Sequence, residues 1–200
     1  MATPQSARPK RKARSPLVFD ISRLGRRPGA MLELQETVPS PSRIGLDLIA
    51  IERDADLTLD LRLESVSEGV LVTGTVRAPT RGECSRCLTP ITGDVEISLT
   101  ELFAYPDSAT ENTTEEDEVG HVVDQTIDLE QSIVDAVGLA LPFAPLCSQD
   151  CQGLCPECGV SLAAEPGHQH DQIDPRFAKL AGMFPAADEE STPERGAGTS

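Results

Sequence analysis

Residues 56–66 read DLTLDLRLESV. Every second position is leucine, at Leu57, Leu59, Leu61 and Leu63, and polar residues fill the positions between them. Successive side chains of a β-strand point to opposite faces of the sheet. This period of two therefore predicts a strand with one face in a core and the other in solvent.

Similar patterns flank this stretch and predict further strands at residues 31–38, 44–51, 70–78 and 94–103. The junctions ERDAD (52–56) and SVSEGV (65–70) are typical of hairpin turns. Closely linked consecutive strands favour an antiparallel meander over crossover units. We expect a sheet of about four to five strands.

One helix is predicted in IDLEQSIVDAVGLALPFAP, over residues 129–140. Its apolar stripe recurs every four residues, at Leu129, Ile133, Val137 and Leu141. Asp128 and Gln131 have the spacing of a capping box at its start. Pro142 and Pro145 end it, because proline lacks the N–H that a helix needs.

Charge divides the chain into segments. Residues 1–27 carry eight Arg or Lys and one acid, a net charge of +7, and the other residues carry nine basic and 32 acidic groups, a net charge of −23. We expect a disordered basic arm at 1–16, one domain at 17–182 and a disordered tail at 183–200. Within the domain, residues 104–126 hold seven acids and no Lys or Arg, which predicts an acidic loop.

Three cysteine pairs and one histidine pair are the candidate metal ligands: Cys84 and Cys87, Cys147 and Cys151, Cys155 and Cys158, His168 and His170. The chain shows no signal peptide and no apolar run of about 18 residues, so we expect a cytoplasmic protein with no membrane contact. Thiols stay reduced in the cytoplasm, and clustered cysteines there indicate metal binding more than disulfides. Cys-x2-Cys lets two thiolates hold one tetrahedral zinc from a tight turn, and CPECG (155–159) fits this better than CSRC (84–87), which lacks the following glycine.

The spacing leaves the pairing of these ligands open. One arrangement has two zinc sites, the first from Cys84, Cys87, Cys147 and Cys151, and the second from Cys155, Cys158, His168 and His170. The alternative is a single zinc held by the two Cys-x2-Cys motifs. In either case we expect an α+β protein with one main helix and a zinc-stapled C-terminal segment over 147–170.

Catalysis is not expected. Neither Cys-x2-Cys motif opens a helix after a strand of a βαβ unit, as a thioredoxin-like redox pair does. A catalytic zinc needs an open position and a base nearby, and only Glu157 lies within a motif. The chain has no phosphate-binding glycine loop and no nucleophile elbow.

Several of these motifs resemble the YceD family of large ribosomal RNA subunit accumulation proteins. The resemblance rests on CSRCL (84–88), LALPFAPLCSQDCQGLCPECGVSL (139–162), IDPRFAKL (173–180) and SRLGRRPGAM (22–31). Family members often have Cys-x-Cys where this chain has His168-Gln-His170, an exchange that suits metal ligands. Shorter members lack the GLCPECG motif and keep the other cysteine pairs, which favours two sites.

The resemblance implies a non-enzymatic ribosome-biogenesis factor that supports the synthesis, processing or stability of large-subunit (23S) rRNA. Arg23, Arg26 and Arg27 are the candidate contacts to rRNA or to a precursor ribosomal particle, and no small-molecule substrate is expected. An alternative is an acidic adapter that chaperones a basic ribosomal protein without touching RNA. A metal-dependent RNA hydrolase is a third hypothesis, which turnover of an rRNA precursor by the zinc-loaded protein would support.

Overall fold

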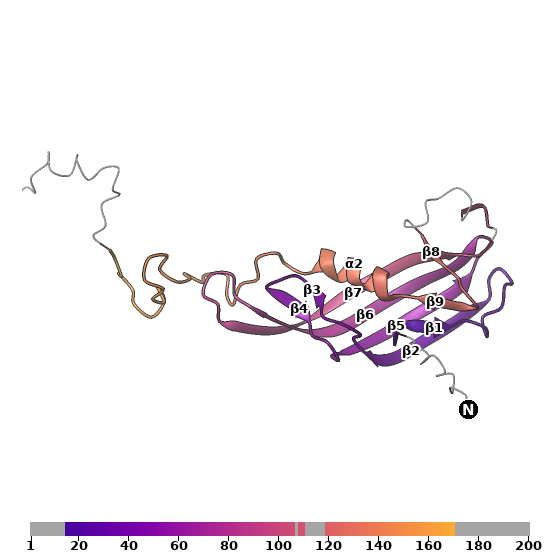
Figure 1. The fold of residues 1–200 in the computed structure, drawn as a ribbon, viewed down its shortest axis with the longest axis horizontal. Helices are drawn as coiled ribbons and strands as arrows, with labels where there is room; N and C mark the ends of the chain where they lie inside the picture. Colours follow the sequence, from indigo (N-terminus) through magenta and orange to yellow (C-terminus); the bar gives the residue numbers. More distant parts are fainter. Residues whose placement is uncertain (1–14, 107, 111–118, 171–200) are drawn as a thin grey trace, which may run out of the picture.

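The computed structural model describes residues 15–106, 108–110 and 119–170. Its main feature is a seven-stranded sheet, and a separate two-stranded sheet joins β1 to β9 (Figure 1). The strands are β1 (Val18–Asp20), β2 (Met31–Pro39), β3 (Ile44–Gly45), β4 (Ile49–Ile51), β5 (Asp56–Ser65), β6 (Gly69–Glu83), β7 (Pro90–Ala104), β8 (Gly120–His121) and β9 (Thr126–Asp128).

The leucine pattern of residues 56–66 predicted a strand with one buried face, and the structure confirms it in β5. The four leucines of β5 are at most 1% exposed, and the residues between them face solvent or are half-buried. In the antiparallel register Leu59 lies opposite Val76 of β6, which lies opposite Ile97 of β7. These buried cross-strand rows form the core of the sheet.

A long hairpin of β6 and β7 gives the molecule its length. Each strand has 15 residues, and the two pair along their full length. At about 3.3 Å per residue, such a strand spans roughly 46 Å. The turn at residues 84–89 therefore lies at the far end of the sheet from β8 and β9 (Figure 1).

The helix α2 (Glu130–Ala140) packs on the sheet beside β3 and β7. Ile133 and Val137 are fully buried on its inner face, as the stripe predicted. Leu141 leaves the helix in an extended conformation, as expected of a residue before proline. The chain then continues beyond the end of the sheet, where Figure 1 shows the segment up to residue 170 as an extended coil.

The predicted capping box is not formed. The N-cap residue is Leu129, and Asp128 Oδ1 accepts a hydrogen bond from the Glu130 N–H at 3.0 Å. The Gln131 side chain instead donates to Asp135 Oδ1, 2.9 Å away on the next turn. The helix therefore begins one residue later than predicted.

The predicted α+β fold with a sheet of four to five strands is wrong. The described residues are mostly β, with a seven-stranded sheet and one helix of 11 residues. Residues 44–51 form two short strands around a turn, and β3, β4 and β8 have only two or three residues each, too few to show a period of two.

The simple meander is also wrong, because β2 does not pair with β3 and β4 does not pair with β5. The strand β2 pairs with β5, and β4 pairs with the distal part of β6 at Arg81 and Gly82. The ERDAD junction is therefore not a hairpin between neighbouring strands, whereas Val66 and Gly69 do close the β5–β6 hairpin with a backbone hydrogen bond of 2.9 Å.

Some predicted segments lie largely outside the described residues. These are the basic arm, of which only Ser15 and Pro16 are described, and the tail at 183–200. In the acidic segment 104–126, residues 107 and 111–118 are likewise outside, and β8 and the start of β9 occupy part of the remainder. Within the described ranges, no helix combines the length and apolar character that a membrane crossing requires.

Candidate metal centres

The turn between β6 and β7 holds the first pair of cysteines, Cys84 and Cys87. The Cys84 N–H donates to the Thr89 carbonyl at 2.9 Å, and the Leu88 N–H donates to the Cys84 carbonyl at 2.9 Å. These two bonds fold the chain back so that both sulfur atoms project from one side of the turn. They form the backbone arrangement of a metal-binding knuckle.

The second knuckle repeats this pattern at Cys155 and Cys158. The Cys155 N–H donates to the Val160 carbonyl at 2.8 Å, and the Gly159 N–H donates to the Cys155 carbonyl at 2.9 Å. Gly159 has a φ of +75°, and Leu88 at the equivalent position has a φ of +59°. The CSRC motif thus reaches the same geometry without a glycine, although a leucine in this conformation carries a cost.

Leu88 provides the first prediction. Its side chain is 56% exposed, so replacement loses little packing. Leu88→Gly removes a strain of about 1–2 kcal/mol and adds about 0.5–1 kcal/mol of chain entropy, whereas Leu88→Val places a β-branched residue at positive φ. We expect melting temperatures in the order Gly, Leu, Val from high to low. Thermal melts of zinc-loaded protein measure this, and a valine variant as stable as the glycine variant would contradict it.

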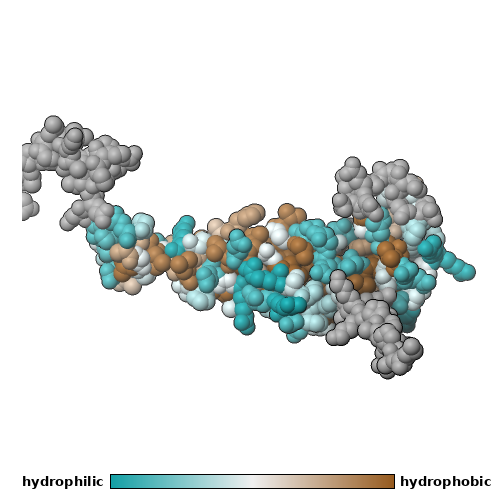
Figure 2. Space-filling model, viewed as in Figure 1, coloured by the Kyte–Doolittle hydropathy of each residue, from teal (hydrophilic) through white to brown (hydrophobic). Residues whose placement is uncertain are grey.

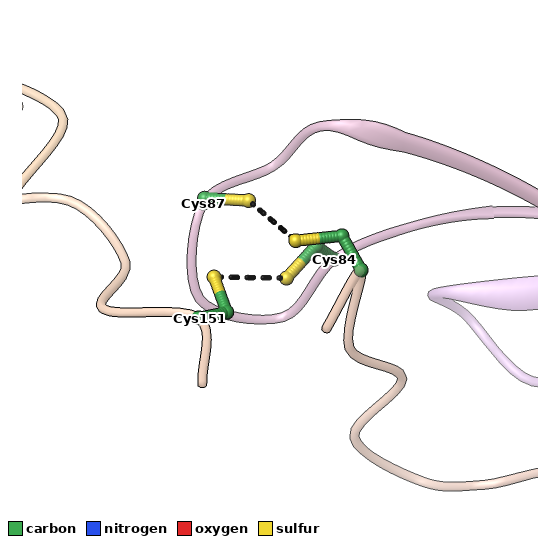
Figure 3. A group of neighbouring side chains, drawn as sticks. Cys84, Cys87 and Cys151 are labelled. Carbon is green, nitrogen blue, oxygen red and sulfur yellow. Dashed lines mark hydrogen bonds between the residues drawn. The ribbon is translucent and has the colours of Figure 1, made fainter. Parts of the chain in front are cut away.

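The segment after α2 brings the second pair of thiols to the first knuckle. The Ser85 N–H donates to the Pro145 carbonyl at 2.8 Å, and Arg86 Nη1 donates to the Cys151 carbonyl at 2.8 Å. As a result Cys84 Sγ lies 3.7 Å from Cys151 Sγ, and Cys87 Sγ lies 3.6 Å from Cys147 Sγ. Figure 3 shows the sulfur atoms of Cys84, Cys87 and Cys151 converging between the β6–β7 turn and this segment.

These distances fit a tetrahedral metal. Zinc–sulfur bonds of about 2.3 Å place the four sulfur atoms of a tetrahedral site about 3.8 Å apart. A disulfide would require about 2.05 Å. All four Sγ atoms of the first cluster, Cys84, Cys87, Cys147 and Cys151, lie within 4.8 Å of one another. The geometry therefore suits four thiolates around one cation.

Hydrogen bonds and burial shift the pKa values of the four thiols of the first cluster in different directions. The backbone N–H of Cys147 donates to Cys84 and, with the N–H groups of Cys87 and Arg86, lowers the pKa of Cys84 to about 6. Hydrogen bonding with Thr89, 3.2 Å away, lowers the pKa of Cys87. Burial raises the pKa of Cys151 to about 12, and the contact with Cys87 raises the pKa of Cys147. Hydrogen bonds thus shift Cys84 and Cys87 toward the thiolate relative to a free thiol, whereas Cys147 and Cys151 hold their protons more strongly.

The pH dependence of metal binding follows from these shifts. At pH 7 a divalent cation must displace the protons of Cys147 and Cys151, so protons compete with the metal as the pH falls. We expect the apparent affinity for Co²⁺ to rise between about pH 6.5 and pH 8, with release of protons from Cys147 and Cys151 at the first cluster. The thiolate–cobalt absorption measures the affinity, and an affinity independent of pH would contradict the assigned ligands.

The second cluster combines two thiols and two imidazoles, from Cys155, Cys158, His168 and His170. Their ligand atoms also lie within 4.8 Å of one another. His168 Nε2 lies 3.2 Å from Cys158 Sγ, His170 Nε2 lies 3.3 Å from it, and the two Nε2 atoms are 2.8 Å apart. The N–H groups of Cys158 and Glu157 lower the pKa of Cys155 to about 6.

Two carboxylates support the imidazoles of the second cluster. Glu165 Oε2 lies 3.4 Å from His168 Nδ1, and Glu157 Oε2 lies 3.4 Å from His170 Nδ1. A proton on each Nδ1 satisfies this contact and leaves the Nε2 lone pair for a metal. Zinc-bound histidines commonly have such a carboxylate behind them, so the donor set fits zinc.

The sequence analysis missed this role of both glutamates. The sequence indicates Glu157 only as a possible catalytic base, and it does not single out Glu165. The sequence feature that could have indicated Glu165 is its position three residues before His168. In the structure these residues form a short turn, in which the His168 N–H donates to the Glu165 carbonyl at 3.2 Å.

A short contact joins the two clusters. The Leu154 N–H donates to the Arg86 carbonyl at 3.1 Å, and Gly153 has a φ of +81°. A Cβ on Gly153 would lie 3.0 Å from the Arg86 carbonyl oxygen, closer than ordinary contact. The second knuckle therefore rests on the first, and both lie beyond the end of the sheet.

The eight candidate ligands form two separate clusters, as in the first of the two arrangements that the spacing left open. Within the described residues, the alternative set of Cys84, Cys87, Cys155 and Cys158 does not gather around one point. Each cluster offers four ligand atoms from the chain itself, which is the number that the tetrahedral coordination of a zinc ion requires.

The arginines proposed to contact RNA lie at the opposite end of the molecule. Arg23, Arg26 and Arg27 are exposed in the loop between β1 and β2. The Arg26 guanidinium lies 4.8 Å above the Tyr105 ring, and both residues line a pocket of about 370 Å³. The loop is fixed to the β5–β6 end by the Gly29 N–H, which donates to the Ser65 carbonyl at 2.8 Å.

The fold and these clusters define a β-sheet protein with two candidate metal centres at one end of its longest hairpin. The chain belongs to the YceD family: the family model described as large ribosomal RNA subunit accumulation protein YceD matches residues 72–184. That range holds all eight candidate ligands. The family's name associates its members with the accumulation of large-subunit rRNA.

The chain is also similar to several uncharacterized proteins. An uncharacterized protein of Mycobacterium tuberculosis H37Rv is 68% identical over 92% of this chain and 89% of its own length. An uncharacterized protein of Mycobacterium leprae is 67% identical over 85% of this chain and 78% of its own length. The uncharacterized protein YlbN of Bacillus subtilis is 29% identical over 65% of this chain and 73% of its own length. No solved structure matches the chain.

Proposed function

We propose that the protein is a non-enzymatic ribosome-biogenesis factor that supports the synthesis, processing or stability of large-subunit rRNA. Membership of the YceD family is the observation that carries this proposal. In this role both clusters hold zinc, which fixes the C-terminal segment to the sheet. The closed coordination of each cluster supports a structural role for the metal.

Arg23, Arg26 and Arg27 are the proposed contacts to rRNA phosphates. They project from one ordered loop, and stacking on Tyr105 orients Arg26. A guanidinium held over an aromatic ring keeps its N–H edge available for a phosphate. These positive charges belong to a chain with a net charge of −16, so the contact would be local.

The test reverses these three charges. Arg23→Glu/Arg26→Glu/Arg27→Glu should abolish cosedimentation with large-subunit precursor particles, because phosphate contacts turn repulsive. Arg53→Glu/Arg62→Glu/Arg81→Glu is the matched control, with the same charge change at other exposed positions. Unchanged sedimentation of the first variant would count against RNA contact by this loop.

A second candidate function is an adapter for a basic ribosomal protein. The observation in its favour is the net charge of −23 on residues 28–200. Crosslinking in cells, by ultraviolet light for RNA and by an amine-reactive bifunctional reagent for protein, distinguishes the two candidates. RNA adducts at the arginine loop support the first, and adducts to a basic protein alone support the second.

A further inference from the structure

A groove lined by acidic residues runs between β7 and α2, away from the metal clusters. Two adjoining pockets of about 550 and 510 Å³ form it, and Glu101, Ser132 and Asp135 line both. Five carboxylates lie along its walls: Glu96, Glu101, Asp128, Glu130 and Asp135. No lysine or arginine is among the described residues that line it.

Among the described residues, four of these five carboxylates form no ion pair. Within the described ranges, Glu96 alone of the five forms an ion pair, with Arg77. Asp135 accepts a hydrogen bond from Gln131, and Asp128 accepts one from the Glu130 N–H. Like charges held this close together favour binding of a positively charged group.

The groove also borders an open strand edge. The strand β7 pairs with β6 along its whole length, and on its other side β8 covers only Phe103 and Ala104. Among the described residues, no strand pairs with that side from Pro90 to Leu102. An extended peptide can add to such an edge through backbone hydrogen bonds. Six extended residues span about 20 Å, which matches the length from Glu96 to Glu101.

The sequence has a segment of the opposite charge directly before Ser15. Residues 1–14 contain no acid and five basic residues: Arg8, Lys10, Arg11, Lys12 and Arg14. The next residue is Ser15, whose hydroxyl donates to Glu130 Oε2 at 2.9 Å. Glu130 is part of the groove wall. The basic segment is therefore tethered one residue away from the carboxylates that complement it.

We propose that residues 8–14 bind in this acidic groove of the same chain. The short tether gives the segment an effective concentration of about millimolar, so even weak ionic contacts are occupied. In this state the groove neutralises five positive charges of the chain. A polyanion would draw the segment out of the groove, and a basic partner would have to displace it. The inference does not depend on the proposed ribosomal role.

Amide NMR spectra of the full zinc-loaded chain test the proposal. The variant Arg8→Gln/Lys10→Gln/Arg11→Gln/Lys12→Gln/Arg14→Gln should shift the amides of Glu96–Glu101 and Gln131–Asp135 relative to the unmodified chain. Raising the salt from about 0.1 to about 1 M shortens the screening length from about 10 to about 3 Å and should move the unmodified spectrum toward that of the variant. Arg23→Gln/Arg26→Gln/Arg27→Gln should leave the groove amides unchanged.

Limited trypsin digestion gives a second measurement. Trypsin cleavage after Lys10, Arg11, Lys12 and Arg14 proceeds from the undocked fraction, so weaker docking speeds it. Glu101→Gln/Asp135→Asn should speed cleavage at these sites at least about threefold. Glu36→Gln/Asp60→Asn, the same change on β2 and β5, should not.

Two outcomes would overturn the proposal. Groove amides that are identical in the unmodified chain and the glutamine variant would show that the segment does not bind there. Shifts that vanish on about tenfold dilution would show that it occupies the groove of a second copy instead. Loss of binding to ribosomal precursors in the arginine-loop variant affects neither measurement.

Discussion

Cys84→Ser/Cys151→Ser should lower the melting temperature by about 8–16 °C and remove one of two bound metal ions. The first cluster joins the β6–β7 turn to the segment after α2, and 59 residues separate Cys87 from Cys147. A cross-link that closes a loop of this size contributes roughly 4 kcal/mol, and each kcal/mol shifts the midpoint by about 2–4 °C in a chain of 200 residues. Thermal melts and metal analysis measure the two effects.

Ser85→Ala/Ser148→Ala is the matched control, because it removes two hydroxyls from the same two segments and no thiol. It should retain both ions and melt within about 2 °C of the unmodified protein. A double serine variant that melts as the control does would show that the first cluster stabilises nothing.

Leu59→Ala should lower the free energy of unfolding by about 3 kcal/mol, because the leucine is 1% exposed in the row with Val76 and Ile97. The urea midpoint should fall while the slope of the transition stays constant. Thr58→Ala, on the exposed face of the same strand, should cost less than about 1 kcal/mol. Both variants should retain two ions, since the clusters lie beyond the sheet.

A Leu59→Ala variant that is as stable as Thr58→Ala would place the core elsewhere. A variant that loses metal as well as stability would show that the clusters and the sheet unfold together. The two replacements thus separate the contribution of the sheet from that of the metal centres.

Long, regular elements were predictable from the sequence, and short ones were not. The period of two in β5 and the four-residue stripe of α2 each repeat several times, so their faces could be assigned. The strands β3, β4, β8 and β9 have two or three residues each, and tertiary pairing rather than local pattern makes them strands. Pairing of β2 with β5 and of β4 with β6 depends on contacts far apart in the chain.

The candidate metal ligands could be predicted from the sequence, but the residues that contact these ligands could be predicted less well. Spacing marked all eight cysteines and histidines, because both knuckles are local motifs. It also suggested that Leu88 would weaken the first knuckle, but Leu88 adopts the positive φ of Gly159. The carboxylates behind His168 and His170 depend on side-chain orientation, which spacing does not show.

Elemental analysis of the purified, desalted protein tests the central claim most directly. Because two separate sets of four ligands gather in space, the account predicts two zinc ions per chain. One ion, or none, would contradict it.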